Sequence, residues 1–298
     1  MRYRGLYRHL EQSTERFEVA PGAKGMVMAV FLLPSYHLVF KVIRDKFAAP
    51  KTTTRERVRQ TYKLVHDHDR AGRLVDAQEY ERMRFPRKRF SEAVLKELLE
   101  ECAMVVREEG DEIIIEHLYI ERRVAPLNLY VHEVEDELAF EAVIDHGHSI
   151  KDLAAVGLFP GDLLVKNFGV TRRGRVVFYD YDEIVPLSEC RFKAMPQGDG
   201  FGAEPSVVAD ERDIFPEELR YFLWGTPKLR KVFEDHHSDL FTVAWWRKMQ
   251  KRLAAGEIPD IYPYPQTRRL ASPVKASRPA VHSTGSSSRA DQSHQEPS

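Results

Sequence analysis

An acid and an amide near the middle of the chain, Asp162 and Asn167, have a spacing that indicates chemistry. A strand-like run, residues 175–179, follows them and leads into the acids Asp180 and Asp182. Phosphoryl transfer from ATP requires one carboxylate to orient the attacking hydroxyl. It also requires an amide oxygen and a second carboxylate to hold Mg²⁺ against the phosphates. These features together are typical of a phosphotransferase of the protein-kinase type. The alternative is a polar turn before a buried hairpin.

A lysine inside an apolar run, Lys41 within residues 38–43, is a second candidate for a functional role. The run predicts a strand, and an unpaired charge buried on that strand would be costly. Lys41 must therefore reach an anion, such as the phosphates of a nucleotide, or extend to the surface at an edge of the sheet. Three acids later in the chain could orient the lysine, and the sequence alone does not distinguish among them: Asp76, Glu79 and Glu81.

A glycine-containing loop, residues 21–25, lies between two apolar runs and predicts a β-hairpin. Backbone N–H groups of such a loop can approach phosphate oxygens, because glycine has no Cβ atom. Taken alone, the loop is better explained by an ordinary hairpin turn. It contains neither the G-x-x-x-x-G-K-[ST] pattern nor a complete G-x-G-x-x-G pattern.

The composition of the 298-residue chain, 43% hydrophobic and 31% charged, is that of an ordinary soluble enzyme. A formal net charge of −1 favours neither nucleic acid nor an anionic membrane as a partner. The two cysteines, Cys102 and Cys190, lie far apart, which predicts no disulfide framework and a reducing cytoplasm. The most apolar stretch, residues 26–33, is much shorter than the roughly 20 residues of a membrane-spanning helix.

The hydrophobic pattern predicts a strand-rich first part and a helix-rich second part, an arrangement typical of a two-lobed α+β enzyme. Strands are expected at residues 17–20, 26–33, 37–43, 113–120 and 175–179. Helices are expected at residues 1–15, 55–69, 91–108, 133–158 (interrupted or adjusted around Gly147), 216–223 and 244–255. Residues 271–298 are rich in Ser, Pro, Gln and His, and are expected to form a disordered tail.

Several segments of the chain resemble the bacterial isocitrate dehydrogenase kinase/phosphatase family. They are residues 20–28, 39–43, 117–123, 159–171, 175–184 and 213–218. The resemblance implies a two-lobed protein-kinase-like fold with a strand-rich N-lobe and a helix-rich C-lobe. The domains would then be residues 1–15 as the remnant of an upstream regulatory domain, 16–122 as the N-lobe, 123–270 as the C-lobe and 271–298 as the tail.

The resemblance also implies a role for individual residues. The nucleotide-binding residues would be Ala20, Pro21, Gly22, Ala23, Lys24, Gly25, Met26 and Lys41. The catalytic residues would be Asp76, Asp162, Lys166 and Asp182, with Asp162 as the acid/base and Asp182 associated with the phosphatase reaction. The Mg²⁺ ligands would be Asn167 and Asp180.

The function implied by the resemblance is that of a bifunctional, ATP-dependent enzyme acting on isocitrate dehydrogenase. Such an enzyme phosphorylates a serine of the dehydrogenase, removes the phosphate again and hydrolyses ATP. It thereby controls flux between the tricarboxylic acid cycle and the glyoxylate bypass. ATP and Mg²⁺ are the expected cofactors, AMP is a candidate effector, and no nucleic acid or membrane partner is expected.

Members of the family carry a regulatory domain before the kinase domain, and the resemblance implies that residues 1–15 are a remnant of it. Two further hypotheses are therefore kept. The chain could bind nucleotide without turnover for want of the regulatory domain, or it could be a small-molecule phosphotransferase of kinase-like fold.

Overall fold

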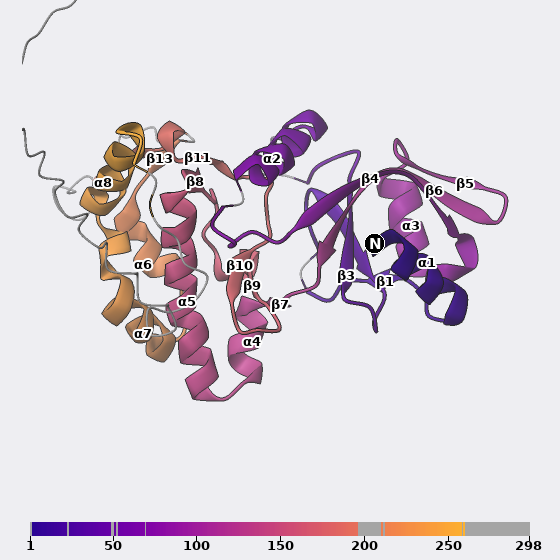
Figure 1. Cartoon of the computed structure of the whole chain (residues 1–298), viewed down its shortest axis with the longest axis horizontal. Coiled ribbons are helices and arrows are strands. Elements are labelled where there is room, and N and C mark those ends of the chain that lie inside the picture. The colour runs from indigo at the N-terminus through magenta and orange to yellow at the C-terminus, as the bar shows by residue number, and fades with distance from the viewer. Residues whose placement is uncertain are drawn as a thin grey trace, which may run out of the picture. The chain divides into compact units, whose positions relative to one another are not determined.

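An antiparallel sheet of six strands occupies the first part of the chain, in the order β1-β2-β3-β6-β4 with β5 paired to β6 (Figure 1). The strands are β1 (Glu18–Val19), β2 (Met28–Leu32), β3 (Leu38–Ile43), β4 (Ala77–Pro86), β5 (Val106–Glu109) and β6 (Glu112–Arg122). The expected hairpin is confirmed, since Glu18 pairs with Leu32 across β1 and β2. This sheet is combined with the helices described below, so the fold class is α+β, as predicted.

The computed structural model describes residues 2–22, 24–48, 51, 53–68, 70–195, 210, 212–257 and 259. The chain divides into two compact units, Met1–Pro263 and Tyr264–Ser298, and every described residue belongs to the first. The predicted tail at residues 271–298 lies outside the described residues. The predicted domain boundaries stay predictions.

The two faces of the sheet have different neighbours because side chains alternate along a strand. On β3, Leu38, Phe40 and Val42 are buried in a core that also contains residues of α1 (Arg2–Gln12) and α3 (Glu92–Glu101). Helix α3 begins at Ser91, whose hydroxyl accepts a hydrogen bond from the N–H of Val94. Lys41 lies between these core positions and therefore belongs to the opposite face of the sheet.

The second part of the chain is mainly helical and surrounds three small sheets (Figure 1). The helices are α4 (Leu127–Glu133), α5 (Asp136–Ala155), α6 (Leu219–Phe222), α7 (Pro227–His237) and α8 (Val243–Ala254). The strands are β7 (Ala125–Pro126), β8 (Leu158–Phe159), β9 (Phe168–Val170), β10 (Val176–Phe178), β11 (Val185–Pro186), β12 (Arg191–Phe192) and β13 (Asp213–Ile214). Single 3-10 turns are η1 (Arg87–Arg89), η2 (Val165–Asn167), η3 (Leu187–Glu189), η4 (Pro216–Glu218) and η5 (Ser238–Phe241).

Helix α2 (Arg55–His68) comes early in the chain but packs into the core of the second part. Its buried residues Val58, Tyr62 and Val65 share that core with Tyr119 of β6 and with side chains of α5. The Tyr62 and Tyr119 rings stack with their centroids 3.9 Å apart. Helix α2 thus connects the sheet to the helical part of the molecule.

Several predicted elements differ from the observed ones. The helix expected at residues 91–108 is wrong in its second half, because α3 ends at Glu101 and β5 follows. The strand β4 and the helix α7 were not predicted. The helix expected at residues 133–158 is α5, which runs through Gly147 without the expected interruption, and the preceding helix α4 was not predicted.

Gly147 lies within α5 and faces His237, the last residue of α7. A Cβ atom at this position would be 2.1 Å from Cδ2 of His237, so the glycine permits the close approach of the two helices. We expect Gly147→Ala to lower the free energy of unfolding by roughly 1–3 kcal/mol through overpacking. Urea denaturation would measure it. Gly225→Ala is the matched control, since a Cβ atom at Gly225 would have no neighbour within 4 Å, and equal losses in both variants would contradict overpacking as the cause.

The helices in the described part of the chain do not have the character of membrane spans. None of them is both long enough and apolar enough to cross a bilayer.

Candidate active site

A cavity of about 1000 Å³ is lined both by the six-stranded sheet and by segments of the second part of the chain. It brings together most of the residues predicted to act in one site: Ala20, Pro21, Gly22, Lys24, Gly25, Met26, Lys41, Asp162, Lys166, Asn167, Asp180 and Asp182. Ala23 lies outside the described residues. Asp76 is not in this wall and instead lines a second cavity.

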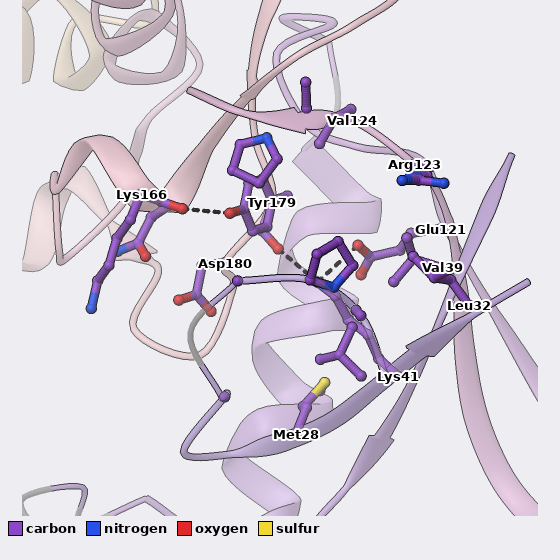
Figure 2. Close-up of a pocket in the computed structure, with 18 of the residues that line it drawn as sticks. Met28, Leu32, Val39, Lys41, Glu121, Arg123, Val124, Lys166, Tyr179 and Asp180 are labelled. Atoms are coloured by element: carbon purple, nitrogen blue, oxygen red, sulfur yellow. Dashed lines mark hydrogen bonds and ion pairs between the residues drawn. The ribbon is translucent and has the colours of Figure 1, made fainter. Parts of the chain in front are cut away.

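Lys41 is fixed in the first cavity by two acceptors from different parts of the fold, as Figure 2 shows. Its Nζ lies 2.8 Å from Oε2 of Glu121 and donates a hydrogen bond of 2.9 Å to the carbonyl oxygen of Tyr179. Oε1 of Glu121 accepts a further hydrogen bond, of 3.1 Å, from the Tyr62 hydroxyl. The ammonium group is therefore paired and oriented within the cavity rather than extended along the surface.

Glu121 is the functional candidate that reasoning from the sequence missed. Lys41 pairs with Tyr119 across β3 and β6, which makes Glu121 its diagonal neighbour on the same face of the sheet. Of the three acids considered for this role, Glu79 contacts Arg59 and His117 instead. Burial raises the pKa of the Glu121 carboxyl, although Lys41 and Tyr62 act in the opposite direction.

The loop at residues 20–26 is held against α3 through Arg44. The Nε of this buried arginine donates a hydrogen bond of 3.0 Å to the carbonyl oxygen of Gly25, and its other nitrogens contact Glu97 and Glu101. Gly25 itself cannot carry a side chain without a shift, because a Cβ atom would lie 2.8 Å from the carbonyl oxygen of Met28. The position of Gly25 at the wall of the cavity is therefore fixed by these contacts.

The acid and the amide of the central motif, Asp162 and Asn167, lie at either end of one short turn. Oδ1 of Asp162 accepts a hydrogen bond of 2.9 Å from the N–H of Leu164. The side-chain amide nitrogen of Asn167 donates to the carbonyl oxygen of Asp162 over 3.2 Å. This bond directs the amide oxygen of Asn167 away from the turn. Oδ2 of Asp162 accepts no hydrogen bond from any described residue, so it is available to a ligand.

Asp180 and Asp182 follow β10 and form a closely coupled pair. Burial, together with the hydrogen bond and the negative charge of Asp182, raises the pKa of Asp180 well above its usual range. Burial alone would raise the pKa of Asp182 too, but its bonds to Asp180 and Lys51 lower it. Lys51, which was not predicted as a site residue, lies 3.0 Å from Oδ2 of Asp182 and also contacts Glu183.

The donors at this end of the cavity suit Mg²⁺, which prefers carboxylate and amide oxygens and usually retains water or phosphate ligands. Asn167 and Asp180 supply such oxygens, and a divalent cation would also relieve the repulsion between Asp180 and Asp182. No group of three or more His, Cys, Asp or Glu side chains within the described residues could hold a metal ion by itself. A metal bound by Asn167 and Asp180 would therefore take its remaining ligands from water or from a bound molecule.

The segment that carries the two acids is fastened to its surroundings by hydrogen bonds. The N–H of Phe178 donates to the carbonyl oxygen of Arg73 over 2.7 Å, and the N–H of Tyr179 donates to that of Asn167 over 3.1 Å. The Tyr179 hydroxyl donates to the carbonyl oxygen of Lys166, and the Tyr181 hydroxyl donates to that of Val75 over 2.6 Å. Figure 2 shows the contact from Tyr179 to Lys166.

Arg73 holds the strand before Asp180 and Asp182 in place. Its guanidinium group binds both carboxylate oxygens of Asp145, at 2.7 and 2.8 Å, and its Nε binds Asp152 at 2.7 Å. Asp145 also accepts a hydrogen bond of 2.7 Å from the N–H of Val176, the first residue of β10. The strand that leads to the acids is thus attached to helix α5 through a buried arginine.

His146 on α5 packs behind the Asn167 turn, with its ring centroid 4.4 Å from that of Phe168. Neither ring nitrogen has a hydrogen-bond partner among the described residues. Burial, with a contribution from His237, lowers the pKa of His146 from 6.5 to about 3. Between about pH 3 and pH 6.5, His146 therefore carries a proton in the unfolded chain but not in the folded chain.

The free energy of unfolding should fall as the pH drops below 6.5, because protonation favours the unfolded state. The contribution of His146 between pH 7 and pH 5 is about 2 kcal/mol, at about 1.4 kcal/mol for each pH unit. We expect His146→Leu to lose that much of the pH dependence, as measured by urea denaturation at the two pH values. An unchanged dependence in the variant would contradict the assignment.

Comparison with known proteins connects this site to a family. Residues 15–266 match the family described as the isocitrate dehydrogenase kinase/phosphatase (AceK) kinase domain. The chain belongs to this family. The matched range of the family's kinase domain includes both walls of the first cavity, from the loop at residues 20–26 to Asp182.

Individual relatives in the kinase/phosphatase family agree with the match. The isocitrate dehydrogenase kinase/phosphatase of Anaeromyxobacter dehalogenans (strain 2CP-C) is 51% identical over 283 residues, covering 90% of this chain and 48% of the relative. Those of Methylibium petroleiphilum and Yersinia pestis (strain Pestoides F) are each 46% identical, over 91% and 90% of this chain and 45% and 48% of the relatives. The chain thus spans about half the length of these relatives.

Proposed function

We propose that this chain is the catalytic portion of a bifunctional, ATP-dependent protein serine kinase and phosphatase that acts on isocitrate dehydrogenase. The proposal rests chiefly on one observation: the Lys41–Glu121 pair lines the same cavity as Asp162, Asn167, Asp180 and Asp182. The names of the relatives supply the substrate. We take the sheet and the helical part as the two lobes of a kinase-like fold with this cavity between them.

The kinase reaction can be assigned to the residues of the cavity. Asn167 and Asp180 would hold Mg²⁺, which would neutralise negative charge on the phosphates of bound ATP. Lys41, fixed by Glu121, would contact the phosphates, and the N–H groups of the loop at residues 20–26 would cover them. Oδ2 of Asp162 would accept the proton of the substrate serine as its hydroxyl attacks, with the ammonium group of Lys166 beside the developing charge.

The phosphatase reaction would use the same cavity, with nucleotide bound and a water molecule in place of the serine hydroxyl. We assign Asp182 to this reaction, since its carboxylate lies beside Asp180 and is held ionised by Lys51. The role of Asp76 stays a prediction, because its side chain lines the second cavity and we assign it no step. Hydrolysis of ATP to ADP would follow when water replaces the protein substrate.

At the level of the cell, the proposal places the chain in the cytoplasm, where it would divert isocitrate between the tricarboxylic acid cycle and the glyoxylate bypass. AMP is proposed as an effector. Since the chain spans about half of its relatives, regulation by AMP is the part of the proposal that depends most on the remainder of those proteins.

The test is transfer of label from ATP. The purified chain is incubated with Mg²⁺, ATP labelled at the γ-phosphate and unphosphorylated isocitrate dehydrogenase, and label on a dehydrogenase serine is the expected result. In a second arm, phosphorylated dehydrogenase should release phosphate only when nucleotide is present. Turnover stimulated by a small metabolite but never by the dehydrogenase would favour a small-molecule phosphotransferase. If a folded sample bound nucleotide tightly but transferred no phosphate, the chain would be a nucleotide-binding module without enzymatic turnover.

A further inference from the structure

A second cavity, of about 790 Å³, shares part of its wall with the first and is lined by an unusual concentration of positive charge. Five arginines line it: Arg122, Arg123, Arg172, Arg173 and Arg175. Asp76 is the one carboxylate among its described lining residues. The chain as a whole has a net charge of −1, so the cluster does not follow from a basic composition.

The arginines come from two segments that are far apart in the chain. One is the end of β6, where Arg122 is the last residue of the strand and the N–H of Arg123 donates to the carbonyl oxygen of His37 over 2.9 Å. The other is the turn between β9 and β10, residues 171–175. The cavity is therefore built by folding and is not a local run of basic residues.

The turn at residues 171–175 presents its arginines on a fixed backbone. Gly174 has a positive φ of 75°, and its N–H donates to the carbonyl oxygen of Thr171 over 2.9 Å. The Nε of Arg175 donates to the carbonyl oxygen of Gly72 over 3.1 Å, which attaches the turn to the segment before Asp76. Little backbone order would have to be gained when a ligand enters.

Four of these guanidinium groups have no counter-ion in the part of the chain that the structure describes. Arg122, Arg123, Arg172 and Arg173 are exposed side chains, and none forms an ion pair with a described residue. Nη2 of Arg172 lies 2.6 Å from Nε2 of His37, a group that can only add positive charge. Nearby Arg73, by contrast, is matched by Asp145 and Asp152. The repulsion among the unmatched groups would be relieved by a bound anion.

We propose that the second cavity binds a small phosphate-bearing anion. Guanidinium groups match the oxygens of phosphate in a two-pronged geometry, and the volume is within the usual range for small-molecule sites. The inference is independent of any reaction in the first cavity. Since Arg122, Arg123 and Arg172 line both cavities, an anion bound in the second would contact the wall of the first.

Isothermal titration of the full chain with inorganic pyrophosphate, without divalent metal, tests the site. Two single variants are informative because Arg173 and Asp76 line the second cavity and not the first. Arg173→Gln should weaken binding at least about fivefold, since it removes a charged hydrogen-bond donor. Asp76→Asn should tighten binding about threefold or more, because it removes the competing negative charge. Opposite effects of two exposed substitutions are not expected from a loss of folding.

Two control variants separate this site from general attraction of anions. Arg57→Gln changes an exposed arginine on α2, outside both cavities, and Lys166→Gln changes an exposed lysine of the first cavity alone. Both should change the affinity by less than about twofold. The proposal would be overturned if wild-type chain did not bind pyrophosphate at millimolar concentration. It would equally be overturned if Arg57→Gln or Lys166→Gln weakened binding as much as Arg173→Gln, or if Asp76→Asn weakened it.

Discussion

Asp162→Asn is expected to lower the rate of phosphate transfer to isocitrate dehydrogenase by about 10²–10⁴-fold, the usual contribution of a positioned general base. Asparagine keeps the size of the side chain, and its oxygen can still accept the hydrogen bond from Leu164. It cannot accept the proton of the attacking hydroxyl. The affinity for Mg²⁺–nucleotide should stay within about twofold, because the metal and phosphate contacts are assigned to other residues. Initial rates of label transfer and equilibrium titration with nucleotide measure the two quantities.

Asp111→Asn is the matched control for this substitution, since it is the same chemical change at an exposed acid outside both cavities. Its transfer rate should equal that of the wild type. If transfer survived Asp162→Asn at more than about a tenth of the wild-type rate, the role assigned to Asp162 would be wrong. A parallel loss of nucleotide affinity would show that Asp162 acts in binding instead.

The second large effect concerns stability rather than rate. Glu121→Ala should lower the free energy of unfolding by about 3–5 kcal/mol, because Lys41 would keep its buried charge without a counter-ion. Both side chains are largely shielded from water, with 10% of the Lys41 side chain and 3% of the Glu121 side chain exposed. The double variant Glu121→Met with Lys41→Met should recover most of the loss, since it removes both charges together. Urea denaturation of the three proteins measures these differences.

Glu18→Ala provides the control, because Glu18 is an exposed acid on the edge strand β1. It should change the free energy of unfolding by no more than about 0.5 kcal/mol. If Glu121→Ala were equally mild, the pair would not be energetically coupled. If the double variant were less stable than Glu121→Ala alone, burial of the two charges would itself be stabilising, contrary to what we expect.

The elements that could be predicted from the sequence are those with a strong apolar pattern. The strand at residues 38–43 was identified because it is a nearly continuous apolar run, and the helix α2 because its buried positions recur with the period of a helix. Strand β4 was missed because most of its side chains are polar, with Glu79, Glu81 and Arg84 all exposed. Its pairing with β6 over almost its whole length holds it in the sheet, and that pairing is not visible in its own residues.

The candidate site could likewise be predicted only where its residues are close together in the sequence. Asp162, Asn167 and Asp180 are linked by short, fixed spacings, and the structure places all three in one cavity. Glu121 lies eighty residues from Lys41, and only the register of β3 with β6 makes the two neighbours. Asp76 was carried over from the resemblance, and its position in the second cavity follows from the path of the chain before β4.

The hydrogen bonds that hold the segment after β10 affect how a kinase/phosphatase could alternate between its two reactions. The backbone around Asp180 cannot swing outward without breaking the bonds that Phe178, Tyr179 and Tyr181 make to two separate segments, residues 73–75 and residues 166–167. An inactive state that depends on moving the acid proposed to bind metal out of the cavity is therefore disfavoured. In a bifunctional enzyme built on this segment, the acids would stay in place during both reactions. Whether a serine hydroxyl or a water molecule approached them would decide between the kinase and the phosphatase reaction. Inhibitors that require a displaced acid should find no pocket to occupy here.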